Sequence, residues 1–407
     1  MRIRALKALR PPPLTAARVS APSFDSLSTA EARQLARGNP LSFLHVSHPE
    51  INLPDNTGPR SDEIYAGAKE YFDKLRKEEH LVRDGEPAVY IYEQHWKCLV
   101  QRGFVVLCHV DDYEKNVIKK HARTSVLKEM DRLHHDLAIG AVSGLVQLAF
   151  RDDPETDNLL GDLSDGKPLY DFTDEQQVRH LAWRITGSVV GDVVAALAKV
   201  PAAYITDGHH RAATSWHAAQ KYRGANPHHT GNETYNWFPV CLLPASSLRI
   251  LPYNCVVKEL NGLSPDQFLK RLRQVCKVTV GASPEPKFAR HVSLYLDGGW
   301  HGLAFDEPTG KNPVAQLDAS ILYDRVLAPI LGIRDLRNPA KIDYVGGIHG
   351  TSKLMKLVDA HPTAAAFSMH PITLEQIMDI ADAGQVMPHK STWFEPKPRA
   401  GLFVHCY

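Results

Sequence analysis

The sequence predicts a mixed α/β fold, of the α+β kind, on three observations. Short runs of β-branched and aromatic residues alternate with amphipathic segments of helical length. The 407 residues exceed one ordinary core at roughly 100–200 residues per domain, so we expect an N-terminal α/β region, 1–245, packed against a C-terminal one, 246–407. In addition, one predicted strand turns directly into a predicted helix at residues 207–211, which we name the DGHHR turn.

The first half of the chain supplies most of the predicted elements. Ser61 opens a helix whose apolar residues, beginning with Ile64 and Ala68, share one face, so this helix should lie on a sheet. The elements that follow are strands at 89–92, 103–108 and 145–150, a helix at 189–200, a strand at 203–206 and a helix at 212–222. Residues 224–236 are rich in turn residues, which indicates a surface loop and a candidate lid.

The second half has a weaker pattern. The predicted elements are a strand at 238–243, a break at 283–286, a strand at 292–296, a helix at 321–331 and a second strand-to-helix turn at 345–351. Gly346, Gly347 and Gly350 lack the G-x-G-x-x-G spacing of a dinucleotide site. These glycines therefore predict a tight turn.

Composition restricts the partners and the compartment. Lys and Arg number 47 against 46 Asp and Glu, so no global field favours nucleic acid or a membrane. The six cysteines are scattered without a C-x-x-C pair, which is typical of reduced thiols in the cytoplasm. The arginine-rich start resembles a transit peptide, but the prolines at 11–13 oppose the helix that such a peptide needs. We expect a cytoplasmic protein.

The DGHHR turn has the chemistry of an anion site. A helix N-terminus presents unpaired N–H groups and a partial positive charge. Gly208 lets the backbone approach a ligand, Arg211 can hold phosphate oxygens, and His209 or His210 can add charge or move a proton. The alternative is a plain helix cap with Asp207 as N-cap, but a cap does not require His-His-Arg in succession.

Two further clusters have functional and ordinary interpretations. The basic run at 119–124, which includes Lys120, Arg123 and Thr124, fits either a substrate site or a solvated surface. Lys390 and Thr392 beside aromatic residues fit either a substrate pocket or a closing strand.

Common catalytic and metal-binding motifs do not identify a function for this chain. A Walker A loop, a G-x-S-x-G elbow and an H-E-x-x-H helix are absent from the sequence, which argues against three large enzyme classes. The adjacent histidine pairs do not have zinc-ligand spacing. Magnesium that travels with a nucleotide needs one or two carboxylates, and Asp207 is the candidate.

Several segments of the chain resemble one family. They are 5–11, 38–46, 118–121, 205–211, 343–347 and 387–403, with Lys390-Ser391-Thr392-Trp393-Phe394-Glu395-Pro396-Lys397 the most specific string. The chain is identified by them as a member of the widespread prokaryotic domain-of-unknown-function family 1015. The resemblance covers nearly the whole chain.

More distantly, the DGHHR turn resembles the nucleotide-phosphate motif of the ParB and sulfiredoxin superfamily, which includes kinases of free serine. This resemblance implies a ParB/sulfiredoxin-like core, phosphate contacts at Gly208, His209, His210 and Arg211, and Asp207 as metal ligand or proton acceptor. The family pattern K-H-E-x-T has a glutamate where this chain has Ala122. If that glutamate is the base, His121, with an ordinary pKa of about 6.5, is the available substitute.

The leading hypothesis is therefore a phosphotransferase that uses Mg²⁺ with ATP or ADP and acts on a small hydroxyl-bearing metabolite, with free serine as the candidate. Its proposed catalytic residues are His121, Asp207 and His209, and its proposed substrate contacts are Lys120, Arg123, Thr124, Lys390 and Thr392. The alternative is a non-catalytic sensor of a nucleotide or phosphorylated metabolite, which Ala122 favours. A nucleic-acid adaptor is a third possibility that the neutral charge disfavours.

Overall fold

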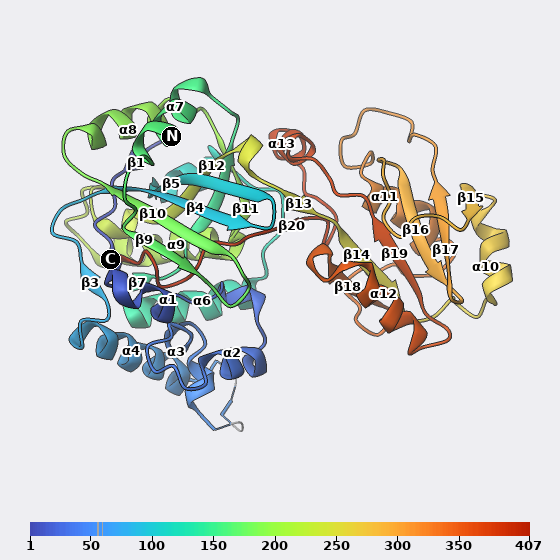
Figure 1. Ribbon diagram of the computed structural model, residues 1–407, viewed down its shortest axis with the longest axis horizontal. Coiled ribbons are helices and arrows are strands. Elements are labelled where there is room, and N and C mark those ends of the chain that lie inside the picture. The colour runs from blue at the N-terminus through green and yellow to red at the C-terminus, as the bar shows by residue number, and fades with distance from the viewer. Residues whose placement is uncertain (55–56, 59) are drawn as a thin grey trace. The chain divides into compact units, whose positions relative to one another are not determined.

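The computed structural model describes residues 1–54, 57–58 and 60–407, and contacts group them into two compact units. Unit 1 comprises Met1–Leu248 and Pro396–Tyr407, and unit 2 comprises Arg249–Glu395. Each unit has its own sheet and helices, so the predicted mixed α/β class is confirmed (Figure 1). The division into a region 1–245 and a region 246–407 that packs against it stays a prediction.

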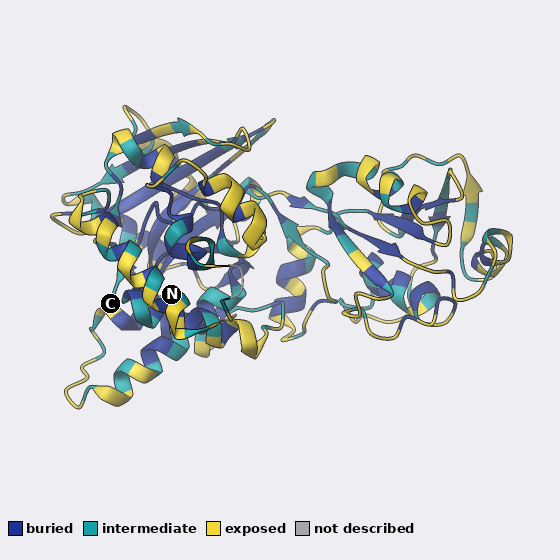
Figure 2. Cartoon of the chain, turned by 90° about the horizontal axis from the view of Figure 1, so that it is seen from below, coloured by how far each residue is buried: buried dark blue, intermediate teal, exposed yellow. Residues whose placement is uncertain are grey.

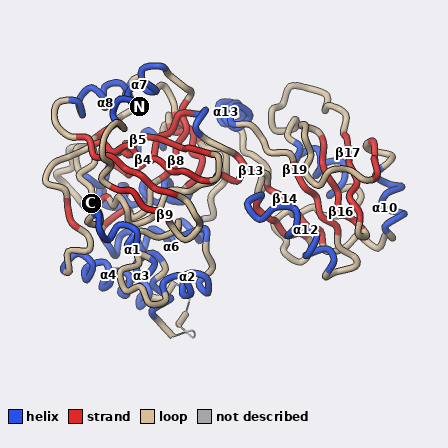
Figure 3. The backbone as a smooth tube through the Cα atoms, viewed as in Figure 1, coloured by secondary structure: helices blue, strands red, loops and turns tan. Residues whose placement is uncertain are grey.

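Nine of the described strands form the main sheet of unit 1 (Figure 3). Their order is β6-β11-β8-β12-β5-β4-β10-β9, with β1 also paired to β5. The β6–β11 and β8–β12 pairs are parallel and the other pairs are antiparallel. The strands are β1 Ile3–Arg4, β4 Val89–Trp96, β5 Leu99–His109, β6 Ile118–Lys119, β8 Val146–Phe150, β9 Tyr170–Thr173, β10 Arg179–Ile185, β11 Ala203–Asp207 and β12 Trp237–Pro244.

Side chains on both faces of this sheet are buried, as the dark blue strands of Figure 2 show. Along β4, Val89 and Ile91 join one hydrophobic cluster while Tyr90 and Tyr92 join another. Successive side chains of a strand point to opposite faces, so the continuous apolar runs seen in the sequence follow from burial on both sides.

The helices of unit 1 cover this sheet and form an additional layer. They are α1 Ala16–Val19, α2 Thr29–Ala36, α3 Leu44–Ser47, α4 Asp62–Lys77, α5 Val110–Glu114, α6 Val126–Ile139, α7 Pro154–Leu163, α8 Val189–Ala198 and α9 His209–Ala225. The helix predicted after Ser61 is confirmed as α4. Its position was predicted incorrectly, because its apolar face packs on α3 and α6 instead of the sheet.

Short strand pairs complete unit 1. β2 Leu9–Arg10 pairs with β3 Val82–Arg83, and β7 Ala141–Val142 pairs with β21 His405–Cys406. The second of these pairs attaches the C-terminal segment, so that unit 1 contains both ends of the described chain.

Unit 2 is built on an antiparallel sheet in the order β15-β17-β16-β19-β14-β18. The strands of this sheet are β14 Tyr253–Val257, β15 Lys277–Val280, β16 His291–Leu296, β17 Gly299–Ala304, β18 Ile342–Gly346 and β19 Ala365–Met369. Two further strands of unit 2, β13 Ile250–Leu251 and β20 Trp393–Phe394, form a separate pair. The helices of unit 2 are α10 Pro265–Leu272, α11 Asp318–Leu322, α12 Gly350–Asp359 and α13 Leu374–Asp382. The helix predicted at 321–331 instead starts at Asp318 and continues as a π-helical turn to Leu327.

The predicted turn is confirmed, because a short 3-10 turn at Gly347–His349 joins β18 to α12. A Cβ at Gly346 would lie 2.7 Å from the Trp393 ring, and one at Gly347 would lie 2.7 Å from Pro252. These two positions therefore need glycine for close packing. Within the part of the chain that the structure describes, no helix is both long and apolar enough to cross a membrane.

Two glycine substitutions test the packing of unit 1. In β5, a Cβ at Gly103 would lie 2.6 Å from the Leu242 carbonyl oxygen of β12, so Gly103→Ala should destabilise the protein by about 1–3 kcal/mol. Gly67, in α4, has open space around it, and Gly67→Ala should stabilise the protein by about 0.5–1 kcal/mol. Urea unfolding measures both changes. A wild-type stability for Gly103→Ala would contradict the β5–β12 packing.

Candidate functional site

The DGHHR turn joins β11 to α9 in unit 1. β11 ends at Asp207, Gly208 takes the left-handed conformation at φ 91°, and α9 begins at His209. The helix therefore starts before the predicted residue 212, and Gly208, not Asp207, is the N-cap. Among the described residues no side chain caps this helix. Its first N–H groups consequently remain available to an anion.

The Asp207 carboxylate is buried and binds two cations. One oxygen accepts a hydrogen bond from Arg211 Nη2, and the other accepts one of 2.7 Å from Lys397 Nζ. Arg211 also donates to the Leu145 carbonyl. A Cβ at Gly208 would lie 3.0 Å from Arg211 Cζ, so the glycine leaves room for the guanidinium to fold back over the turn.

Asp25 completes the group of charges. Its carboxylate lies 4.0 Å from Arg211 Nη2, and 39% of the side chain is exposed. Partial burial would raise the pKa of this carboxyl, but Arg211 and Lys397, with a hydrogen bond from Ser23, lower it well below its usual value. The two carboxylates and two cations therefore balance, and the Asp25–Arg211 contact is the loosest of them.

Two histidines meet beside this turn. The rings of His121 and His209 are perpendicular, with centroids 4.5 Å apart. Burial, followed by the charge of the other imidazole, lowers the pKa of His121 well below 6.5. Burial, followed by His210 and Arg211, lowers the pKa of His209 to about 3. Both rings are therefore neutral at pH 7, and the two predicted clusters converge.

Three buried polar atoms here have no hydrogen-bond partner among the described residues: His121 Nδ1, His209 Nε2 and Gln147 Nε2. Contact with the Ile205 backbone raises the pKa of His121, but burial and His209 lower it by more. Because buried polar atoms in folded proteins nearly always have a partner, these atoms indicate a ligand or an ordered water.

Asp25, Gln147 and Lys397 also belong to this group, although their roles were not predicted from the sequence. Gln147 is the polar residue in the apolar run at 145–150, and its side-chain oxygen accepts from Thr206 where β11 bulges against β8. That interruption of an apolar strand was a usable signal. Lys397 stood in the most specific family string without a role, and Asp25 had no pattern around it.

The other candidates of unit 1 lie around the start of α6. His210 Nε2 accepts a hydrogen bond of 3.1 Å from the Ser125 N–H, which fixes the start of α6. The Lys120 ammonium lies 4.0 Å from the centre of the Tyr113 ring, and burial lowers the pKa of this lysine. Arg123 is exposed and Thr124 is half-buried in the loop that follows β6. Substrate contacts for these three residues stay predictions.

Lys390 and Thr392 belong to unit 2. The Lys390 ammonium lies 5.2 Å from the centre of the Tyr253 ring. Directly after Thr392, β20 pairs with β13, as the closing-strand interpretation predicted. A substrate-binding role for Lys390 and Thr392 stays a prediction.

A bound metal at Asp207 does not fit the observed contacts. Both carboxylate oxygens already accept hydrogen bonds from cations. Across the described ranges, no group of three or more His, Cys, Asp or Glu side chains is arranged to hold a metal ion. We therefore derive no chemical step from a protein-bound metal.

The fold and this site define a mixed α/β protein with an uncapped helix N-terminus beside buried, neutral imidazoles. The chain belongs to the family described as "Protein of unknown function (DUF1015)", whose profile matches residues 3–320. No curated protein matches the chain.

Several solved structures are similar at low identity. A free serine kinase in complex with AMP is 14% identical, over 71% of this chain and 86% of that chain, with a TM-score of 0.35. SbnI with a C-terminal truncation from Staphylococcus aureus is 12% identical, over 72% and 82%, with a TM-score of 0.39. A conserved hypothetical protein from Pyrococcus furiosus is 14% identical, over 72% and 93%, with a TM-score of 0.34. Similarities this low carry no argument about function.

The lowered histidine pKa values predict a loss of stability in acid. Between pH 6.5 and about 3, unfolded His209 binds a proton that the folded protein does not, so the free energy of unfolding falls as the pH falls. One such histidine contributes at most about 1.4 kcal/mol per pH unit. Urea unfolding from pH 7 to 4.5 should therefore show a shallower dependence for His209→Gln than for the wild type. The exposed His228→Gln is the control, and equal slopes for His209→Gln and wild type would contradict the buried neutral ring.

Proposed function

We propose that the DGHHR turn binds nucleotide phosphates and that the protein is a phosphotransferase acting on a small hydroxyl-bearing metabolite, with free serine as the first candidate. One observation carries the proposal. The uncapped N-terminus of α9 lies beside two buried imidazole nitrogens, His121 Nδ1 and His209 Nε2, which have no hydrogen-bond partner among the described residues. Helix N-termini favour phosphate through their N–H groups and their dipole.

A phosphate would bind with little rearrangement. The N–H groups of the first turn of α9 would donate to its oxygens. An oxygen could also replace the exposed Asp25 carboxylate at Arg211 Nη2, since that contact is already 4.0 Å long. Arg211 would keep its hydrogen bond to Asp207, so the guanidinium would stay fixed while its positive charge binds the phosphate. In this arrangement Asp207 acts as a positioning residue.

His121 is the candidate base because its ring is neutral at pH 7 and its Nδ1 has no partner among the described residues. Its lowered pKa makes it a weak base, however, and the family pattern has a glutamate where this chain has Ala122. The same observation favours the second candidate, a sensor that binds the nucleotide or a phosphorylated metabolite without turnover.

The proposal includes a ParB/sulfiredoxin-like core for unit 1 and ATP or ADP as the nucleotide. AMP is added to the test because free serine kinase structures contain AMP or ADP. Magnesium enters as the ion that accompanies the nucleotide.

Arg211→Ala tests the phosphate site. Thermal unfolding of the wild type with ATP, ADP or AMP, with and without Mg²⁺, should show saturable stabilisation, about 2.7 kcal/mol at a hundred times the dissociation constant. Arg211→Ala should weaken nucleotide affinity about tenfold to a hundredfold, because a charged hydrogen bond is lost. Lys221→Ala, exposed on the same helix, is the control. Wild-type affinity in a folded Arg211→Ala protein would sink the proposed site.

A product assay separates the enzyme from the sensor. The wild type, ATP or ADP with Mg²⁺, and free serine should yield phosphoserine by mass spectrometry. His121→Gln should lower the rate by about a hundredfold to ten-thousandfold while nucleotide affinity stays unchanged. Ala122→Glu, which restores the family residue, should raise the rate. Saturable nucleotide binding with no product in the wild type or in Ala122→Glu would favour the sensor and reject the enzyme.

A further inference from the structure

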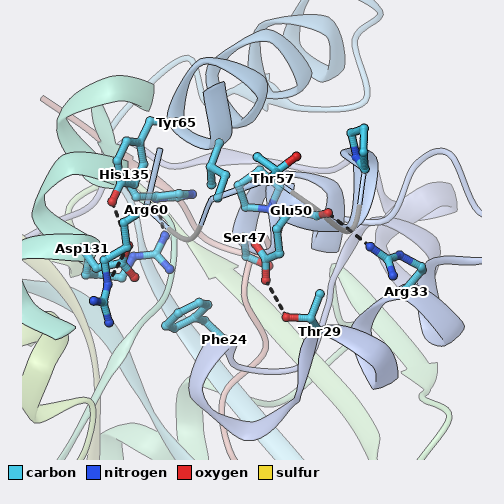
Figure 4. A pocket seen from close by; sticks show the side chains of 14 residues that line it. Phe24, Thr29, Arg33, Ser47, Glu50, Thr57, Arg60, Tyr65, Asp131 and His135 are labelled. Atoms are coloured by element: carbon cyan, nitrogen blue, oxygen red, sulfur yellow. Dashed lines mark hydrogen bonds and ion pairs between the residues drawn. The ribbon is translucent and has the colours of Figure 1, made fainter. Parts of the chain in front are cut away.

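A cavity of about 360 Å³ lies in unit 1 among α2, α3, α4, α6 and the short helix Phe24–Ser26 (Figure 4). We propose that this cavity binds a free amino acid, with the carboxylate at Arg132 and Arg60 and the ammonium at Glu50. The DGHHR turn contributes no residue to the lining.

The cationic end is built around a buried, fixed Arg132. Its Nε donates to Asp136 over 3.3 Å, its Nη2 donates to His135 Nδ1, and its guanidinium lies 4.6 Å from the centre of the Phe24 ring. His135 Nε2 donates to the Val46 carbonyl, which leaves Nδ1 free to accept. Among the described residues no acceptor lies on Arg132 Nη1. That edge of the guanidinium is available to a carboxylate.

Arg60 adds a second cation that a ligand can recruit. Half of its side chain is exposed, and its guanidinium lies 3.9 Å from Asp131. Asp131 also accepts a shorter hydrogen bond, of 2.8 Å, from the Tyr65 hydroxyl. Because the Arg60–Asp131 contact is at the limit of an ion pair, a ligand carboxylate can compete for Arg60 while Tyr65 keeps Asp131 in place.

The anionic end is Glu50. Figure 4 shows Glu50 and Thr29 on the opposite side of the cavity from Arg60, Asp131 and His135. Burial would raise the pKa of Glu50, but the hydrogen bond from His48 lowers it, so the carboxylate is ionised. The Thr29 hydroxyl donates to Oε1, and His48 Nδ1 lies 3.0 Å from the same oxygen, while His48 Nε2 donates to the Phe24 carbonyl. Both of these side-chain contacts are to Oε1, so Oε2 can accept from an ammonium group.

Ser47 provides the independent sign of a ligand. This side chain lines the cavity and is only 2% exposed, yet its hydroxyl has no partner among the described residues. A hydroxyl buried in this way normally bonds to protein, water or ligand. The wall of the cavity thus offers a polar contact between its two charged ends.

Size and charge together select the ligand class. Ligand cavities commonly measure about 300–1,000 Å³, so this one is near the lower limit and suits an amino acid better than a nucleotide. Arg132 and Arg60 at one end and the Glu50 carboxylate at the other match a zwitterion, with Asp131 beside Arg60 and Arg33 beside Glu50 as further charges of the lining. The inference does not depend on the proposed nucleotide site, because binding in the cavity requires no residue of the DGHHR turn.

The first experiment uses the full chain without nucleotide. Thermal unfolding with each of the common free L-amino acids should identify at least one that stabilises the protein saturably, and calorimetry then measures its affinity. The carboxamide and the α-hydroxy acid of that amino acid should both bind at least about tenfold more weakly, since each lacks one charge. If no amino acid binds, or if both analogues bind as well as the parent, the proposal is overturned.

Variants then locate the ligand. Glu50→Gln and Arg60→Ala should each weaken binding about tenfold or more, whereas Arg37→Ala, exposed on the same helical layer, should bind as the wild type does. Unliganded unfolding midpoints verify that each variant folds. Wild-type affinity in both Glu50→Gln and Arg60→Ala overturns the proposal.

Arg211→Ala separates this proposal from the nucleotide proposal. It should retain wild-type affinity for the amino acid, even if its nucleotide affinity falls. Loss of amino-acid binding in Arg211→Ala, with retention in Glu50→Gln and Arg60→Ala, would place the ligand at the DGHHR turn and overturn the cavity site. Amino-acid binding in a protein that binds no nucleotide would reject the nucleotide proposal alone.

Discussion

The buried carboxylate of Asp207 is the constraint on which unit 1 depends. Removing a carboxylate from water costs several kcal/mol unless its oxygens are paired, and removing one partner of such a pair leaves an uncompensated charge. Here one oxygen binds Arg211 of α9 and the other binds Lys397 of the C-terminal segment. One charge therefore joins strand β11, the following helix and the C-terminal segment. The same pairing favours glycine at position 208, because the absence of a Cβ leaves the space that the Arg211 guanidinium occupies.

The C-terminal segment is consequently part of the candidate site. After Lys397, the buried Arg399 binds Asp174 and the Ser20 carbonyl. Phe403 then packs against tyrosines of β4, and the chain ends by pairing β21 with β7. These contacts attach the C-terminal segment to the core of unit 1. The lysine that balances Asp207 is thus positioned by the core of unit 1, although it lies far from Asp207 in the sequence.

Local features of the site were predictable from the sequence, and the contacts between distant segments were not. The order strand, glycine, helix follows from short-range pattern and placed the DGHHR turn correctly. The meeting of His121 and His209 depends instead on the parallel pairing of β6 with β11. Each histidine stands two residues after the end of its strand, so parallel neighbours bring the two rings to the same edge of the sheet. The sequence analysis had no strand at 118–119 and no evidence of that pairing.

Helix α6 explains why the cavity could not be predicted from the sequence. A buried helix normally shows an apolar stripe, but α6 also buries Glu129, Arg132, His135 and Asp136. These buried groups form hydrogen bonds with one another or with a side chain of a neighbouring helix. Arg132 binds His135 and Asp136, and Glu129 binds His217 of α9. Because charged side chains usually face solvent, the sequence does not predict that Arg132 is buried. Because α6 begins at the contact with His210 and lines the cavity farther along, one internally paired helix connects the DGHHR turn to the second candidate site.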